Sequence, residues 1–268
     1  MHALAALVTA FALPGFTPAA PEPGGGRLLE GTFPGTVRAG YVYLPPAFNP
    51  ANRYPVVYLL RGMPRSPSDV PGRHGARDFA DATIAAGLVR PFIGVIPAAG
   101  TTPHYDGEWA GRWETALVDN VLPWVDATLP TIAAPAGRVL AGLSAGGYGA
   151  VDIALHHPNL FGAIESWSGY FSPLRDGPFK QAGPAILAAD DPTLLVPQEA
   201  AKLRADGVRF FVSTGPGHSH WIPNGASQQF AHELRALGLR TTYRKYASSR
   251  GQWREQLDAG LEWAFARS

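Results

Sequence analysis

Short apolar segments alternate with longer amphipathic segments along most of the chain. The short segments are rich in β-branched and aromatic residues, as strands buried on both faces of a sheet are. The longer segments repeat apolar residues at helical spacing, so one face of each predicted helix can pack against a core. The predicted strands cover residues 37–44, 55–60, 92–96, 138–141, 163–167, 208–213 and 241–246. The predicted helices cover residues 78–88, 113–129, 146–157, 193–205, 226–237 and 253–266.

This alternation predicts the α/β class, with a mostly parallel central sheet and helices on both of its faces. The chain has 268 residues, of which 46% are hydrophobic, which is enough for one large core. We therefore expect residues 37–268 to form a single domain. A formal net charge of +1 and the lack of a Lys/Arg-rich block argue against nucleic acid as a partner. The absence of cysteine excludes disulfides and thiolate metal sites.

The N-terminus has the pattern of a secretion signal. Residues 3–13 are apolar and uncharged, and small residues follow up to Ala20, which precedes Pro21. This predicts a signal peptide over residues 1–20 with cleavage near Ala20, although the usual Lys or Arg before the apolar run is missing. The run is shorter than the roughly 20 residues that span a bilayer, so no stable transmembrane anchor is expected. Residues 21–36 are predicted to be a flexible leader and the start of the mature chain, and the mature protein is expected to be secreted or held in the cell envelope.

The most specific local motif is the pentapeptide Gly142-Leu143-Ser144-Ala145-Gly146. It follows a predicted strand and precedes a predicted helix, which is the context of a nucleophile elbow. Glycines flank the serine because this turn is too tight for larger side chains, and the turn presents the hydroxyl above the end of the strand. Ser144 is therefore the candidate nucleophile.

Further motifs occur in a fixed order around this pentapeptide. They are Pro55-Val56-Val57-Tyr58-Leu59-Leu60-Arg61-Gly62-Met63-Pro64, Trp113-Glu114-Thr115, His157-Pro158-Asn159-Leu160-Phe161-Gly162 and Ser166-Trp167-Ser168-Gly169. Together with residues 142–149 they resemble the esterase D and antigen 85 superfamily. That group includes feruloyl esterases, S-formylglutathione hydrolases and secreted mycolyltransferases of actinobacteria. The resemblance runs from about Val37 to Phe265 and implies an α/β-hydrolase fold.

The resemblance also implies roles for three groups near the elbow. Ser144 would attack an ester carbonyl and become acylated. The backbone N–H groups of Met63 and Ala145 would form the oxyanion hole, where each donor is typically worth ~3 kcal/mol of transition-state stabilisation. No cofactor or metal is implied, and the expected partner is a small-molecule or cell-envelope ester.

The C-terminal third departs from the pattern of these relatives. They carry an acid in the loop after the strand that matches 208–213, and a histidine in the loop after the strand that matches 241–246. Here His218 stands at the position of the acid, and Ser248 stands at the position of the histidine. Neither partner of the nucleophile is therefore in its usual place.

Another histidine is needed as a base, because a serine hydroxyl is a weak nucleophile until its proton is removed. His156 and His157 lie 12 and 13 residues beyond Ser144 on the predicted helix, which places them roughly 18 Å away. His232 is expected on the surface of its helix. The hypothesis is that His218, or alternatively His220, has taken over the base role, since their loop follows the carboxyl end of a strand.

Other assignments of these loop residues stay open. His218 and His220 can be loop residues with no part in proton transfer, or they can bind a metal together with His104 or Asp106. Asp176 is a candidate for the acid that orients the base, because it follows a predicted strand.

Two functions are consistent with these motifs. The first is a secreted serine esterase or acyltransferase that forms an acyl-Ser144 intermediate. The second is a catalytically silent relative that uses the old cleft to bind a glycan, lipid or matrix ligand. The complete glycine frame of Ser144 favours the enzyme, whereas the loss of both usual partners favours the binding protein.

Overall fold

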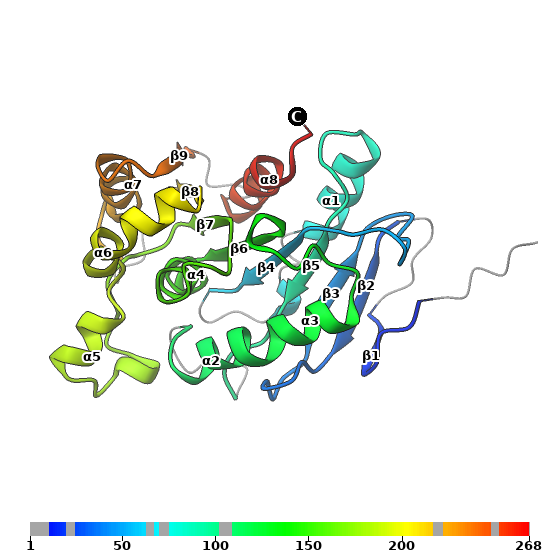
Figure 1. The fold of residues 1–268 in the computed structure, drawn as a ribbon, viewed down its shortest axis with the longest axis horizontal. Coiled ribbons are helices and arrows are strands. Elements are labelled where there is room, and N and C mark those ends of the chain that lie inside the picture. The colour runs from blue at the N-terminus through cyan, green and yellow to red at the C-terminus, as the bar shows by residue number, and fades with distance from the viewer. Residues whose placement is uncertain are drawn as a thin grey trace, which may run out of the picture.

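A nine-stranded mixed sheet forms the centre of the described structure (Figure 1), a computed structural model that describes residues 11–19, 25–62, 67–69, 75–101, 109–216, 222–247 and 252–267. The strands are β1 (Phe16–Pro18), β2 (Arg27–Gly31), β3 (Gly40–Leu44), β4 (Val56–Leu60), β5 (Ile93–Ile96), β6 (Arg138–Leu143), β7 (Ala163–Trp167), β8 (Arg209–Thr214) and β9 (Arg240–Lys245). Their order is β1-β2-β3-β5-β4-β6-β7-β8-β9. The strands from β5 to β9 in this order run parallel, and β1 to β3 add an antiparallel edge.

Helices cover both faces of the sheet (Figure 1). The helices are α1 (Ala76–Ala85), α2 (Arg112–Thr115), α3 (Leu122–Thr128), α4 (Ala145–His156), α5 (Pro184–Ala189), α6 (Pro192–Ala205), α7 (Ala226–Ala236) and α8 (Gln252–Phe265). Buried residues of α1 and α8 pack on one face, and buried residues of α3, α4, α6 and α7 pack on the other. The predicted fold class is therefore confirmed.

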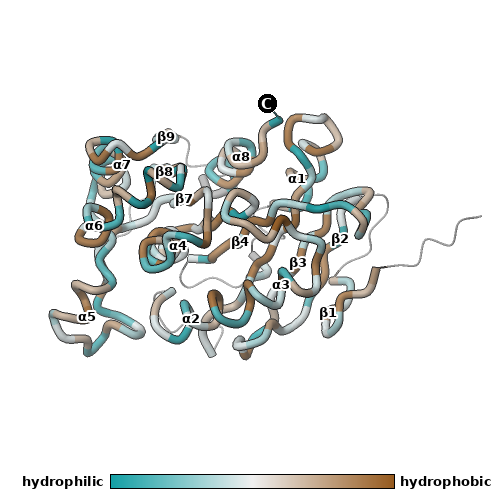
Figure 2. Tube along the Cα trace, viewed as in Figure 1, coloured by the Kyte–Doolittle hydropathy of each residue, from teal (hydrophilic) through white to brown (hydrophobic). Residues whose placement is uncertain are grey.

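Each central strand supplies side chains to both cores, because successive residues of a strand point to opposite faces. In β4, Tyr58 and Leu60 join the core under α4, whereas Val57 and Leu59 join the core under α8. Apolar stretches in Figure 2 accordingly run through the middle of the molecule. This double burial explains why the central strands are nearly continuous apolar runs in the sequence.

Every predicted strand and helix is present, with small shifts at its ends. The helix predicted over 113–129 is interrupted by a π-helical segment at Ala116–Val121. The sequence pattern missed β1, β2 and α5. The first two lie within the predicted signal peptide and leader, where short strands between glycines and prolines offer too few apolar positions for a periodic signal.

The predicted signal and leader overlap with structured residues. Leu13 and Phe16 are buried, and β1 pairs with β2 in antiparallel register. Residues 27–31, within the segment predicted to be the leader and the start of the mature chain, form a strand of the sheet. Among the described helices, none is both long enough and apolar enough to cross a membrane.

Candidate active site

Ser144 occupies a sharp turn between the end of β6 and the start of α4. Its backbone has φ 53° and ψ −115°, which is a strained combination for a residue with a side chain. The turn is held by a hydrogen bond from the Ser144 N–H to the Trp167 carbonyl on the neighbouring strand (2.9 Å) and one from the Tyr148 N–H to the Ser144 carbonyl (2.9 Å). The surrounding structure therefore maintains the strained backbone conformation of Ser144.

The two framing glycines are required by close backbone contacts. A Cβ at Gly146 would lie 2.0 Å from the Leu60 carbonyl oxygen, and a Cβ at Gly142 would lie 2.1 Å from the Gly146 carbonyl oxygen. Real side chains do not tolerate such distances, so β4, β6 and α4 meet here only because both residues are glycine. The sequence interpretation of the pentapeptide as an elbow agrees with this geometry.

The Ala145 backbone N–H lies at the first position of α4, directly after Ser144. The first N–H groups of a helix have no intrahelical acceptor and carry the positive end of the helix dipole. Ala145 itself is fully buried. This amide is thus available to a developing oxyanion beside Ser144.

Met63, the second predicted oxyanion donor, lies outside the described residues, but the chain just before it is placed. A Cβ at Gly62 would lie 2.7 Å from the Leu143 carbonyl oxygen and 3.0 Å from Ser144 Cβ. The loop that leaves β4 therefore passes directly against the elbow. Only glycine at position 62 permits this approach.

Arg61 holds that loop in place through hydrogen bonds. Its side chain is buried and donates from Nη2 to the Ala99 carbonyl (2.7 Å), while its own carbonyl accepts a hydrogen bond from Trp109 Nε1 (3.0 Å). These bonds tie the loops after β4 and β5 to Trp109, which is buried in the core. The start of the predicted oxyanion loop is therefore rigidly positioned.

A neutral hydrogen-bond network joins the carboxyl ends of β7 and β8 to α8. The buried Gln256 accepts from Ser213 Oγ at Oε1 (2.8 Å) and donates from Nε2 to Ser168 Oγ (3.0 Å). Ser168 Oγ also accepts from the Gly215 N–H (3.1 Å). Ser168 adjoins Trp167, which holds the Ser144 amide, so the network fixes the start of the loop at Gly215 relative to the elbow. Sequence reasoning missed it because its members are up to 88 residues apart.

The candidate bases His218 and His220 lie outside the described residues, as do Ser248, His104 and Asp106. His232 is exposed on α7, as predicted. Asp176 precedes a 3₁₀ turn at Gly177–Phe179. Of the predicted site residues, the structure thus places Ser144 and Ala145 together at the elbow.

His156 and His157 end α4 at its far end from Ser144, as predicted, and both contact one carboxylate. Glu114 Oε1 lies 2.9 Å from His156 Nδ1 and 2.9 Å from His157 Nε2. His156 Nε2 lies 2.9 Å from the Ala189 carbonyl oxygen. Since both nitrogens of His156 face acceptors, the ring is an imidazolium, and the hydrogen bond to Glu114 is the main cause that raises its pKa to about 10. Glu114 therefore joins its own helix, α2, to the end of α4.

Glu114, His156 and Asp190 are the described residues whose spacing could suit a metal, since one ligand atom from each lies within 4.8 Å of the others. The double hydrogen bonding of His156 leaves its ring no lone pair for an ion. Asp191, the neighbour of Asp190, caps α6 by accepting from the Thr193 N–H (2.9 Å), as expected for an Asp before Pro192. Glu114 forms ion pairs with His156 and His157, and Asp190 lies close to His156.

Comparison with protein families identifies the scaffold that carries this elbow. A family model named Esterase, with the description "Putative esterase", matches residues 33–264. The chain belongs to the Esterase family. The elbow and its flanking motifs lie within the matched region, so the resemblance inferred from the motifs is confirmed.

Several relatives of this Esterase family member are longer than the region that they share with it. It is 33% identical over 138 residues to an endo-1,4-beta-xylanase/feruloyl esterase of Xylanibacter ruminicola, covering 48% of this chain and 19% of the relative. It is 30% identical over 154 residues to the MPT51 antigen of Mycobacterium leprae, covering 54% of this chain and 50% of the relative. The matches thus span half or less of these relatives.

A solved ferulic acid esterase has a similar fold over nearly the whole chain. The TM-score is 0.73 at 25% sequence identity, and the match covers 91% of this chain and 99% of the other. The α/β-hydrolase fold implied by the sequence motifs is therefore confirmed.

Proposed function

We propose that this member of the Esterase family cleaves carboxylic esters, or transfers their acyl group, through an acyl-Ser144 intermediate. Ser144 Oγ adds to the ester carbonyl while a base takes its proton. The alcohol then leaves with that proton, and water or a second hydroxyl releases the acyl group by the reverse sequence. The observation that carries the proposal is the strained elbow, in which Ser144 directly precedes the first backbone N–H of α4, that of Ala145.

The proposed base is His218, with His220 as the alternative. Gly215 lies three residues before His218 and is bonded to Ser168, next to the residue that accepts from the Ser144 amide. The loop with both histidines thus starts beside the elbow, at the carboxyl end of β8. This anchoring supports a base from that loop, and it makes Gln256 a positioning residue.

The test is hydrolysis of short-chain aryl esters by the purified chain. Ser144→Ala should reduce turnover by about a thousandfold or more, because the acyl-enzyme cannot form. His218→Ala or His220→Ala should give a loss of about a hundredfold or more in whichever variant removes the base. His232→Ala, an exposed histidine on α7, is the matched control and should leave turnover unchanged.

A second readout separates nucleophile activation from substrate choice. A fluorophosphonate probe should label Ser144 in the parent chain and not in Ser144→Ala, with the adduct located by mass spectrometry. Labelling without turnover of the esters tried would retain the proposed nucleophile and redirect the search to other acyl groups. Absence of both labelling and turnover between pH 5 and 9 would overturn the enzyme proposal.

The alternative is a silent relative that binds a glycan, lipid or matrix ligand in the same cleft. The observation that favours it is the network of Ser168, Ser213 and Gln256 at the ends of β7 and β8, which contains no charged group. A hydroxyl and amide network can hold loops without assisting proton transfer. Ligand binding that is unchanged by Ser144→Ala, in the absence of turnover, would establish that the protein is a silent binding protein.

We further propose that the protein is exported, because residues 1–20 have the pattern of a signal peptide. Cleavage after Ala20 would remove Phe16–Pro18, the strand that pairs with β2. N-terminal sequencing of protein recovered from the medium tests this. A start at Pro21 supports the cleavage, whereas retention of the protein in the cytosol, with Phe16 still present, contradicts it.

A further inference from the structure

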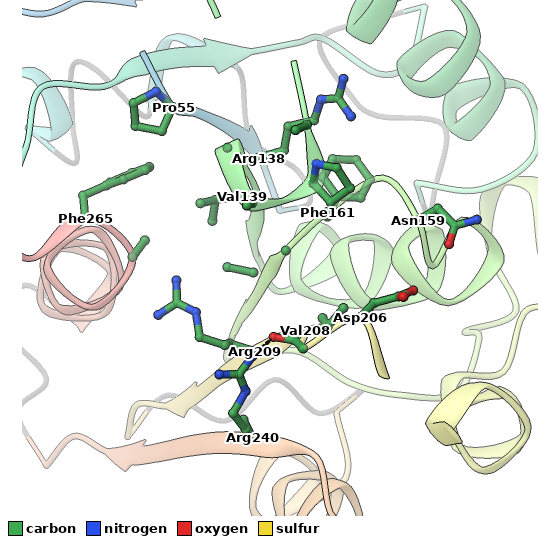
Figure 3. Close-up of a pocket in the computed structure, with 18 of the residues that line it drawn as sticks. Pro55, Arg138, Val139, Asn159, Phe161, Asp206, Val208, Arg209, Arg240 and Phe265 are labelled. Atoms are coloured by element: carbon green, nitrogen blue, oxygen red, sulfur yellow. Dashed lines mark hydrogen bonds between the residues drawn. The ribbon is translucent and has the colours of Figure 1, made fainter. Parts of the chain in front are cut away.

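A cavity of about 560 Å³ lies at the end of the sheet opposite to Ser144 (Figure 3). Its lining includes Arg138 and Arg209, the first residues of β6 and β8, whereas Ser144 follows the last residue of β6. Because a strand rises about 3.3 Å per residue, the two places are roughly 20 Å apart. The cavity is therefore separate from the proposed ester site.

Three arginines that line this cavity have no carboxylate partner among the described residues. Arg90, Arg209 and Arg240 come from separate segments that meet at the amino ends of the parallel strands. The Arg209 guanidinium lies 4.5 Å from the centroid of the Trp263 ring, and that of Arg90 lies 5.9 Å from the Phe265 centroid. These aromatic contacts orient the guanidinium groups without neutralising them.

Arg240 is oriented in a similar way, since it donates to the Gly207 carbonyl. The acid at the rim, Asp206, is bonded to Lys202 (3.1 Å), which satisfies part of its charge. Arg138, a fourth arginine of the lining, is bonded to Asp126 Oδ2 (2.5 Å), and its guanidinium points away from Arg209 and Arg240 in Figure 3. Arg90, Arg209 and Arg240 thus have no ionic partner within the part of the chain that the structure describes.

The three cations are close enough to act on one another. Burial is the main cause that lowers the pKa of Arg209, and the charge of Arg240 lowers it further. Glu165 lies near Arg209 but is fully enclosed in the core, and burial raises its pKa to about 8. It is therefore mostly protonated at neutral pH and does not balance the arginines. The cavity has an excess of positive charge that an anion would relieve.

Apolar residues share the rest of the lining with Asn159 and Asp206. They include Val139, Phe161, Phe265, Pro55 and Pro135. The volume exceeds that of an inorganic anion, so the walls suit a ligand that has an apolar body as well as a charged group. Guanidinium groups match planar and tetrahedral oxyanions through paired N–H donors.

We propose that this cavity binds a small organic phosphate, with the phosphate between Arg209, Arg240 and Arg90 and the organic group against Val139 and Phe265. A phosphate monoester is favoured over a carboxylate because its two charges compensate more of the three cations. The site is independent of Ser144 and goes beyond the proposed ester chemistry.

Calorimetric titration of the full chain with phenyl phosphate tests the proposal. We expect a submillimolar dissociation constant that weakens about tenfold or more in Arg209→Gln and in Arg240→Gln. Inorganic phosphate should bind less tightly because it lacks the apolar body, and benzoate less tightly because it carries one charge. Lys245→Gln removes an equal charge from the opposite end of β9 and should leave the affinity unchanged.

Two further measurements keep the outcome clear. Arg90→Gln changes an exposed side chain, so its loss of affinity is not an effect of misfolding, and thermal unfolding checks each variant. Backbone NMR signals of residues 206–209 and 240 should shift on addition of phenyl phosphate, whereas those of residues 142–146 should not. No binding up to about 10 mM, or an affinity equal to that of the parent in all three arginine variants, would overturn the site. Benzoate binding as tightly as phenyl phosphate would overturn the choice of phosphate.

Discussion

Different kinds of interaction define the two ends of the parallel sheet. At the carboxyl end, main-chain contacts and neutral side chains fix the elbow: Gly146 lies against Leu60, and Gln256 joins two serines. At the amino end, charged groups dominate: three arginines line the cavity with no carboxylate partner among the described residues, and Arg138 is bonded to Asp126. The same strands thus carry a sterically defined end and an electrostatically defined end.

This difference determines what disturbs each end. Steric constraints act at contact distance and do not depend on salt or pH, so the elbow changes only when atoms are added or removed. Charge effects reach further and respond to pH and ionic strength. The proposed reaction centre at the carboxyl end therefore keeps its geometry over a wide range of pH and ionic strength. The charged groups at the amino end respond to ions.

The largest expected effect comes from Gly146→Ala. The added methyl group would overlap the Leu60 carbonyl, so β4 and α4 must separate, at a cost of about 3 kcal/mol or more in the free energy of unfolding. Chemical denaturation measures this. Gly183→Ala is the matched control, because nothing lies within 4 Å of its added Cβ and its φ is −73°. Equal stability of the two variants would contradict a steric frame.

A smaller effect is expected from Glu165→Gln, which removes the buried carboxyl that lies near Arg209. Burial raises the pKa of Glu165 to about 8 in the folded protein, whereas the unfolded chain loses this proton near the ordinary pKa of 4.5. The folded state binds more protons in this interval, so the parent loses stability as pH rises through it. The amide variant should lack this loss, giving a difference of about 2–3 kcal/mol between pH 5 and 8.

Denaturation curves at several pH values provide the measurement for Glu165. Asp78→Asn, which removes a carboxylate from the first turn of α1, is a control that should keep the slope of the parent. If the parent and Glu165→Gln have the same pH dependence, the buried carboxyl is not protonated in the folded state.

The smallest effect is expected from His156→Gln. The pKa of His156 is raised from 6.5 to about 10 in the folded protein, so its stabilisation is complete below pH 6.5 and is lost as pH rises toward 10. The variant should be less stable by about 1–2 kcal/mol at pH 6 and should approach the parent at pH 10. His232→Gln, on the exposed face of α7, serves as the control. A difference that is constant from pH 6 to pH 10 would argue against an imidazolium.

Sequence reasoning predicted the steric end well because its signal is local. The glycines around Ser144 are required within five consecutive residues, and the buried strands are continuous apolar runs. The charged amino end of the sheet has no such local sequence pattern. Arg90, Arg209 and Arg240 are far apart in the chain, and only the parallel register of β8 and β9 brings the last two together. The contact of Glu114 with both histidines likewise spans more than 40 residues.

The two edge strands explain how so wide a sheet avoids pairing with the sheet of another molecule. β1 has only three residues and ends at Pro18, which has no amide hydrogen to offer a further strand. β9 carries Arg240, Arg244 and Lys245, whose like charges repel a second copy of the same edge. Before the proposed cleavage after Ala20, both edges therefore resist intermolecular strand addition, which protects the uncleaved chain from edge-to-edge aggregation at high concentration.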